Sequence, residues 1–253
     1  MYVIEHEFDK ANADFCKAIE INPECTLAFH GCGIVRVQTG ELDKAIADFS
    51  QAIRIESTFA EAYHNRGHAR AGKGEFEKAV SNYFEAIQIN PELAGAYVNR
   101  GVAQNKTGQI TAAIADFSEA IRINPNYALA YHNRGLARGK QDEYDKSIAD
   151  FSEAIRINPT IAEAYFSREI SLARKREFEK AIADFSQAIR INPEYADAHL
   201  RRGACHERLG ELDKAIADYS DAIRINPKFG KAYENRALSR ARRASMTKPR
   251  RTS

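Results

Sequence analysis

Two histidines four residues apart, His64 and His68, have a spacing that fits metal chemistry. Residues at i and i+4 share one face of a helix, so two imidazoles there could hold one ion. The HExxH pattern of a helical zinc site is missing, and we interpret the pair as surface residues. Four cysteines occur without a CxxC pair, which indicates free thiols rather than disulfides or a zinc site: Cys16, Cys25, Cys32 and Cys205.

Catalysis needs a nucleophile with a base, a carboxylate pair or a metal, and none of these has a signature in the sequence. Neither GxxxxGK[ST] nor GxGxxG occurs, so nucleotide binding has no support. We therefore predict no catalytic residue, no metal, no cofactor and no enzymatic activity.

The composition predicts a folded protein, since 44% of the 253 residues are hydrophobic. No apolar run reaches the roughly 18 residues of a membrane span, and MYVIEHEFDK has acids where a signal peptide is apolar. We expect a soluble, cytoplasmic protein. The net charge is +2, but residues 231–253 alone carry +7, from eight Lys or Arg and one Glu. The remaining residues therefore sum to −5, and we do not expect a nucleic-acid partner.

One phrase of thirteen residues, AIADFSEAIRINP at 113–125, occurs in seven near-copies exactly one period of 34 residues apart. A second phrase, AYHNRG at 62–67, recurs with the same period. Self-similarity at this period predicts stacked repeats rather than one globular core.

Each repeat is predicted to form two helices. In the repeat 94–127, Tyr97, Gly101 and Gln104 mark one face of the first helix, and the second carries a broader apolar stripe around Phe117. That stripe is too wide for one partner, so we expect it to pack on its own first helix and on the next repeat. Glycines between the helices allow a left-handed turn, and prolines stop the second helix.

The repeat resembles the tetratricopeptide repeat (TPR). The matching places in the repeat that starts at Ala60 are the fourth, eighth, twentieth, twenty-fourth, twenty-seventh and thirty-second: Tyr63, Gly67, Ala79, Tyr83, Ala86 and Pro91. The sequence pattern AIADF…AIRINP is similar to that of bacterial members of the family. The resemblance implies an all-α α-solenoid, a right-handed superhelix of antiparallel helix pairs whose first helices line a concave groove.

The period divides the sequence into six complete repeats with different ends. We place the repeats at 26–59, 60–93, 94–127, 128–161, 162–195 and 196–229. Residues 1–25 are a partial repeat, mainly a second helix from about Phe8 to Ile21. Its poorly covered edge around Phe15 favours a fragment of a longer protein over self-association through that edge. Residues 230–244 are predicted to form a capping helix and 245–253 a basic disordered tail.

Four residues depart from the repeat. Ser57 replaces the proline, and Asp142 and Arg176 replace the turn glycine, which we interpret as tolerable loop changes. Glu169 replaces the small residue at which the two helices meet, and a buried unpaired carboxylate is costly. It either tilts outward or pairs with an arginine, or it marks a joint in the superhelix.

An aspartate of the second helix and an arginine of the first recur in most repeats, for example Asp116 and Arg100. We predict contacts between them that tie each second helix to its own or the following first helix. These arginines are then structural. Cys32 takes the arginine's place in the first complete repeat.

The remaining polar places of the first helix are predicted to face the groove, where function can vary. The candidate peptide-binding residues occupy the fifth, sixth and thirteenth places: Asn65, Asn99, Asn133, Asn235, His30, His64, His132, Lys106, Lys140, Arg174, Arg201 and Arg208. The alternative is that they merely keep an exposed face soluble.

These residues favour a scaffold that binds an extended segment of a partner protein. Asparagine amides both donate to and accept from a peptide backbone, and the row is similar to the asparagine ladder of O-linked N-acetylglucosamine transferases. The basic row favours an acidic or carboxy-terminal segment. The heat-shock carboxylate clamp is not expected, because its places read His64 and His68. The competing hypothesis is the repeat region of a larger enzyme such as a glycosyltransferase; RNA binding fits badly.

Overall fold

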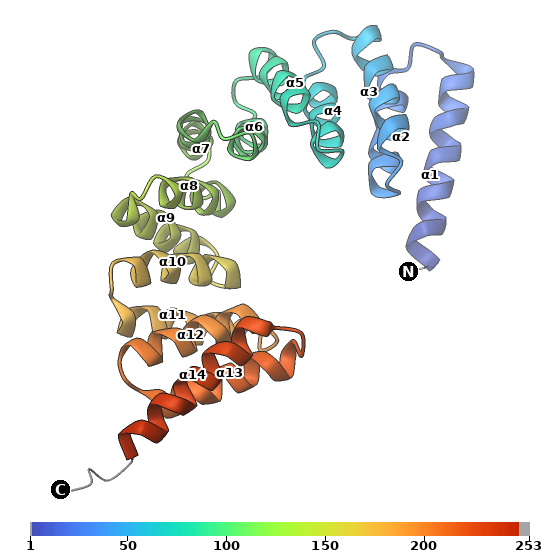
Figure 1. The fold of residues 1–253 in the computed structure, drawn as a ribbon. Helices are drawn as coiled ribbons and strands as arrows, with labels where there is room; N and C mark the ends of the chain where they lie inside the picture. The colour runs from blue at the N-terminus through green and yellow to red at the C-terminus, as the bar shows by residue number, and fades with distance from the viewer. Residues whose placement is uncertain (1, 248–253) are drawn as a thin grey trace, which may run out of the picture. The chain divides into compact units, whose positions relative to one another are not determined.

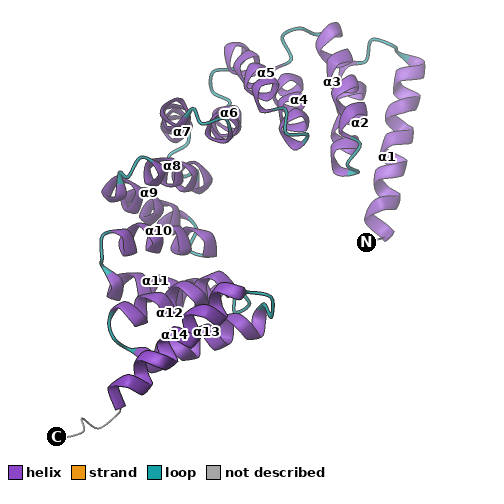
Figure 2. Ribbon diagram, in the orientation of Figure 1, coloured by secondary structure: helices purple, strands orange, loops and turns teal. Residues whose placement is uncertain are grey.

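The computed structural model describes residues 2–247, which form fourteen helices and no strand (Figures 1 and 2). The prediction of an all-α solenoid is confirmed. The chain divides into two compact units, residues 1–133 (unit 1) and residues 134–253 (unit 2), with the boundary inside helix α8. No described helix has the length and apolar character that a membrane crossing requires.

Unit 1 consists of a first helix followed by three helix pairs and the beginning of α8. The helices are α1 (Tyr2–Ile21), α2 (Thr26–Gln38), α3 (Leu42–Ile55), α4 (Ala60–Gly72), α5 (Phe76–Ile89), α6 (Ala94–Lys106), α7 (Ile110–Ile123) and α8 (Ala128–Lys140). Unit 2 continues with α9 (Tyr144–Ile157), α10 (Ala162–Arg174), α11 (Phe178–Ile191), α12 (Ala196–Arg208), α13 (Leu212–Ile225) and α14 (Gly230–Thr247).

The turn between the two helices of a pair depends on one left-handed residue. Gly74 and Gly108 have φ of +79° and +82°, as the sequence predicted. Asp142 and Arg176 take the same conformation at φ +59° and +63°. A residue with a Cβ is disfavoured there by roughly 1–2 kcal/mol, so these two turns are tolerated rather than optimal.

The residue that follows each second helix, its C-cap, lies directly before the proline place. Asn90 has φ −130° and ψ 91°, the extended conformation that a following proline imposes. Its Oδ1 accepts a hydrogen bond from the N–H of Glu92 at 3.1 Å, which closes the turn. Glu56 has the same backbone angles although Ser57 follows it, so this turn does not require the proline.

The core follows the repeat. The alanine at the twentieth place is fully buried, as at Ala79 and Ala113, and so is the aromatic ring four residues later. Glycine at the eighth place allows close packing, because a Cβ on Gly101 would lie 2.7 Å from the Phe117 ring. The apolar stripe packs on both sides as predicted: Ala86 and Ile87 of α5 form one cluster with Ala96 of α6, and Tyr63 of α4 lies against it.

Two predictions about the ends were wrong. Helix α1 begins at Tyr2, not near Phe8, and Phe15 is half-buried because its ring lies over Gly31 of α2. Helix α14 continues to Thr247, so Ser245–Thr247 are not part of a disordered tail. Arg242 and Arg243 form ion pairs with Glu207 of α12 and Asp213 of α13, which hold this end. The rest of the predicted tail, 248–253, lies outside the described residues.

Candidate functional site

The predicted arginine–aspartate contacts exist, and each joins the two helices of one repeat. Arg100 on α6 donates two hydrogen bonds to Asp116 on α7, at 2.7 and 2.6 Å, and Asp116 is only 5% exposed. The same pairs, sixteen residues apart, occur in unit 2: Arg134–Asp150, Arg168–Asp184 and Arg202–Asp218. Two parallel bonds to a shielded carboxylate are the strong form of this contact.

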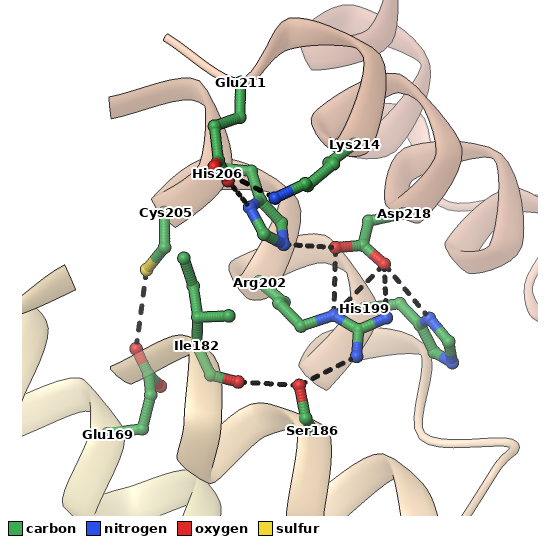
Figure 3. A network of polar contacts seen from close by, with 10 residues as sticks. All are labelled: Glu169, Ile182, Ser186, His199, Arg202, Cys205, His206, Glu211, Lys214 and Asp218. Atoms are coloured by element: carbon green, nitrogen blue, oxygen red, sulfur yellow. Dashed lines mark hydrogen bonds and ion pairs between the residues drawn. The ribbon is translucent and has the colours of Figure 1, made fainter. Parts of the chain in front are cut away.

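The same arginines also reach the second helix of the preceding repeat. Arg202 donates to Ser186 Oγ at 3.0 Å while it holds Asp218, so its guanidinium joins α11, α12 and α13 (Figure 3). Arg168 contacts Ser152 in the same way. These arginines therefore have a structural role, as predicted.

Two repeats keep this contact with different residues. Asn82 replaces the aspartate and accepts from Arg66 Nε at 2.6 Å. Where Cys32 replaces the arginine, Arg36 one turn further along pairs with Asp48. Burial raises the pKa of Asp48 even so, although Arg36 opposes the shift.

Histidine–asparagine pairs link the first helices of neighbouring repeats in unit 1. Asn65 Nδ2 lies 2.8 Å from His30 Nε2, and Asn99 Nδ2 lies 2.8 Å from His64 Nε2. Burial lowers the pKa of both His30 and His64, so the neutral ring accepts from the amide. Asn65 and Asn99 therefore do not present complete amides to a ligand, and the predicted ladder is corrected to that extent.

A cavity of about 300 Å³ lies beside these pairs, and we name it the amide cavity. Its wall combines predicted residues with apolar side chains that the sequence analysis did not select: Ile34, Val37, Gln38, Phe49, His64, Asn65, His68 and Asn99. Ile34 remains 41% exposed. The cavity offers apolar contact and neutral hydrogen-bonding groups but no permanent charge.

A cavity of about 670 Å³ in unit 2 has a different wall, and we name it the arginine cavity. Three predicted residues, Arg174, Arg201 and Arg208, line it together with Arg176. Glu169 and Cys205 also line it, and both are buried. The guanidinium of Arg201 lies 5.5 Å from the Phe166 ring centre, a cation–π distance.

The other predicted residues lie outside these two cavities. The amide of Asn133 donates to Leu129 O of its own helix at 2.9 Å, and Asn235 is half-buried on α14. His132 is half-buried, whereas Lys106 and Lys140 are exposed near the ends of α6 and α8. Six of the twelve predicted residues thus line the two cavities, three in each, and peptide binding by the set stays a prediction. The six are His64, Asn65 and Asn99 in the amide cavity and Arg174, Arg201 and Arg208 in the arginine cavity.

Glu169 takes neither of the two structural positions that we considered for it, an outward tilt or an ion pair with an arginine. It does not tilt outward, because it is 1% exposed. Its Oε1 accepts a weak bond from Cys205 Sγ at 3.9 Å, and its Oε2 has no hydrogen-bond partner (Figure 3). Burial raises its pKa to about 9, so it is uncharged near neutral pH.

One group in the described part of the chain has metal-ligand geometry: His199, Asp218 and Asp221, with donor atoms within 4.8 Å of one another. Both oxygens of Asp218 already accept hydrogen bonds from Arg202. A cation there would meet a guanidinium on the same carboxylate, so the residues do not fit a metal site.

Comparison with known sequences gives a consistent family assignment. Family models described as tetratricopeptide repeats match residues 33–74, 68–108, 105–142, 128–161 and 170–228. No curated protein matches by sequence.

Solved structures share the fold. PilF of Pseudomonas aeruginosa has a TM-score of 0.74 at 18% identity, over 85% of this chain and 98% of its own. YrrB, described as a TPR protein with an unusual peptide-binding site, has 0.61 at 24%, over 73% and 95%. A chain of the Cut9–Hcn1 assembly has 0.73 at 18% over 92% of this chain, which spans only 46% of that longer one.

Proposed function

The chain belongs to the tetratricopeptide-repeat family, and we propose that it binds an acidic, extended segment of a partner protein across the first helices. A scaffold for protein–protein interaction is the typical role of this fold. The arginine cavity carries the finer proposal, because it gathers positive charge at places that the repeat leaves free to vary.

The charges in this cavity are not used for folding. Arg168 and Arg202 pair with Asp184 and Asp218. Arg174, Arg201 and Arg208 form no ion pair with any described residue, although they lie on the same helices, α10 and α12. Unpaired guanidinium groups on a concave wall favour carboxylate ligands, with two parallel hydrogen bonds each.

Two further observations support a peptide rather than a small molecule. The amide cavity in unit 1 offers neutral hydrogen-bonding groups and apolar contact, which suit backbone and uncharged side chains. YrrB, which shares the fold, is described as having a peptide-binding site. In this proposal, His30, His132, Asn133, Asn235, Lys106 and Lys140 supply secondary contacts.

Calorimetric titration with a hexaglutamate peptide, acetylated and amidated at its ends, tests the proposal. We expect binding that weakens with salt and falls at least tenfold when Arg174 and Arg208 are both replaced by Gln. Arg190→Gln, at an exposed position of α11 outside the cavity, is the matched control and leaves binding unchanged. Equal binding of hexaglutamate and a neutral hexaglutamine peptide would contradict the proposal.

A further inference from the structure

The arginine cavity contains a buried hydrogen-bonding atom with no partner. Glu169 Oε2 is shielded from solvent and unbonded, although the carboxyl group lines a cavity of about 670 Å³. An unsatisfied buried polar group costs roughly 1–3 kcal/mol. The other five complete repeats have glycine at this place, at Gly33, Gly67, Gly101, Gly135 and Gly203, so the glutamate is not required by the fold.

The Cβ of Glu169 also bears on the packing of α10 against α11. In the glycine repeats, a Cβ at the eighth place would lie 2.5–2.8 Å from the partner aromatic ring. Such a distance requires a shift of the neighbour. The repeat that contains Glu169 must therefore accommodate this Cβ by a shift of the helix or of the Phe185 ring, next to the cavity that the carboxyl group lines.

The charges around Glu169 come from three helices. Burial and Asp184 of α11 favour its neutral form, whereas Arg201 of α12 and the bond from Cys205 oppose it. The balance leaves a carboxylic acid, whose O–H is a donor. Together with Arg174, Arg201 and Arg208, this O–H gives the cavity several donors and a net positive charge, which favour an anion over a cation.

The apolar part of the wall narrows the choice of anion. Ile170, Ala173, Ala204 and Phe178 lie beside the arginines. They suit the methylene arm of a carboxylate side chain better than the fully hydrated oxygens of a phosphate.

We propose that the arginine cavity is a carboxylate subsite in which the carboxyl O–H of Glu169 donates a hydrogen bond to the ligand's carboxylate while Arg174, Arg201 and Arg208 bind its negative charge. The subsite rests on the proposed function, since it receives one carboxylate of the acidic segment. An O–H bond to a carboxylate is short and strong, and it satisfies the buried oxygen that the empty cavity leaves unpaired.

Titration of the full chain with glutarate, followed by NMR chemical shifts, tests the subsite without a peptide. Only the protonated Glu169 can donate, so affinity for glutarate falls roughly tenfold from pH 7.5 to pH 10 as the group with pKa about 9 ionises. Glu169→Gln keeps a donor: its affinity at pH 7.5 stays within about twofold, and the pH dependence disappears. Glu169→Gly, the residue of other repeats, loses about tenfold.

The outcomes separate this subsite from the proposed function. If hexaglutamate binds but Glu169→Gln and wild type share one pH profile, the subsite is wrong and the scaffold proposal stands. If glutarate binds with the expected profile but hexaglutamate does not bind, the peptide proposal fails and the subsite stands. Inorganic phosphate binding more tightly than glutarate overturns the choice of carboxylate. Arg190→Gln again serves as the control.

Discussion

The amide cavity and the arginine cavity occupy equivalent places of the repeat yet differ in chemistry. Each is lined by the ninth, twelfth and thirteenth residues of one repeat and the sixth and ninth of the next. In unit 1 the sixth and thirteenth are Asn65 and Gln38; in unit 2 they are Arg201 and Arg174. The same backbone positions thus provide neutral groups in one unit and cations in the other.

The difference shows where the sequence can change without loss of fold. Both units contain arginine–aspartate pairs between the two helices of a repeat and small buried residues at the twentieth place, and we call these residues the packing frame. Where a frame residue changes, as at Asn82 or Ser147, the contact or the burial is kept, whereas the cavity places change their chemistry. Glu169 lines the arginine cavity and also occupies the eighth place, at which the two helices of its repeat meet. We therefore expect substitutions in the packing frame to change stability and substitutions in the cavities to change binding.

Breaking the frame is expected to have the largest effect, and an equal effect in both units. Asp116→Ala in unit 1 and Asp184→Ala in unit 2 each leave a shielded arginine unpaired, at a cost of about 3 kcal/mol in free energy of unfolding. Asp116→Asn costs less, about 1 kcal/mol, because Asn82 already fills this place beside Arg66. Urea denaturation measures all three. A loss below about 1 kcal/mol in either alanine variant would show that these pairs do not support the frame.

The pH dependence of stability is expected to reveal Glu169. Its pKa is raised from 4.5 in the unfolded chain to about 9 in the folded one. The contribution of neutral Glu169 to the free energy of unfolding is therefore fully present below pH 4.5. It is lost progressively as the pH rises from 4.5 toward 9. Relative to Glu169→Gln, wild type should lose about 1.4 kcal/mol per pH unit between pH 6 and pH 8. Parallel stability curves for the two proteins would mean that the carboxyl group ionises normally.

The turns distinguish the two units in a smaller way. Gly108→Ala in unit 1 should lower the free energy of unfolding by about 1 kcal/mol, because alanine is strained at φ +82°. Asp142→Gly in unit 2 should raise it by up to about 1 kcal/mol, since glycine relieves that strain. Thermal unfolding followed by circular dichroism gives both values. The same sign for both changes would refute the strain argument.

Converting one cavity toward the other should hardly affect stability. Arg201→Asn places in unit 2 the residue that Asn65 provides in unit 1, and it removes only the contact over Phe166, worth about 0.5 kcal/mol. Glutarate binding is expected to weaken strongly in this variant. If stability fell by several kcal/mol, Arg201 would belong to the frame rather than to the cavity.

The sequence predicted the frame well because the frame is periodic. Arg100 and Asp116 recur with their repeat, so their pairing followed from position, as did the left-handed conformation of Gly108. The cavity chemistry depends on neighbours in other repeats. The bond between His30 and Asn65 spans 35 residues, one period plus one. The sequence signal for this bond is a histidine at the fifth place of one repeat together with an asparagine at the sixth place of the following repeat.

Glu169 shows the limit more clearly. Because the other complete repeats have glycine at this place, the sequence indicated that burying a carboxylate there is costly. Its charge state depended on whether an arginine would pair with it. The nearby arginines do not pair with it, and burial decides its protonation instead. That balance depends on solvent access to one side chain, which no pattern of residue types specifies. The ends of α1 and α14 were misjudged because the period no longer guides the prediction there.

Arg202, which joins three helices, also limits the lengths by which this array of repeats can grow or shrink in evolution. Arg202 finds Asp218 sixteen residues ahead and Ser186 sixteen behind. Loss of residues 162–195 would bring Ser152 into the place of Ser186, and Arg202 would keep an equivalent hydroxyl. Gain or loss of any number that is not a multiple of 34 would separate the arginine from one partner. Duplication can therefore lengthen the array in whole repeats without new bonding, while each added repeat brings fresh cavity residues for selection to alter.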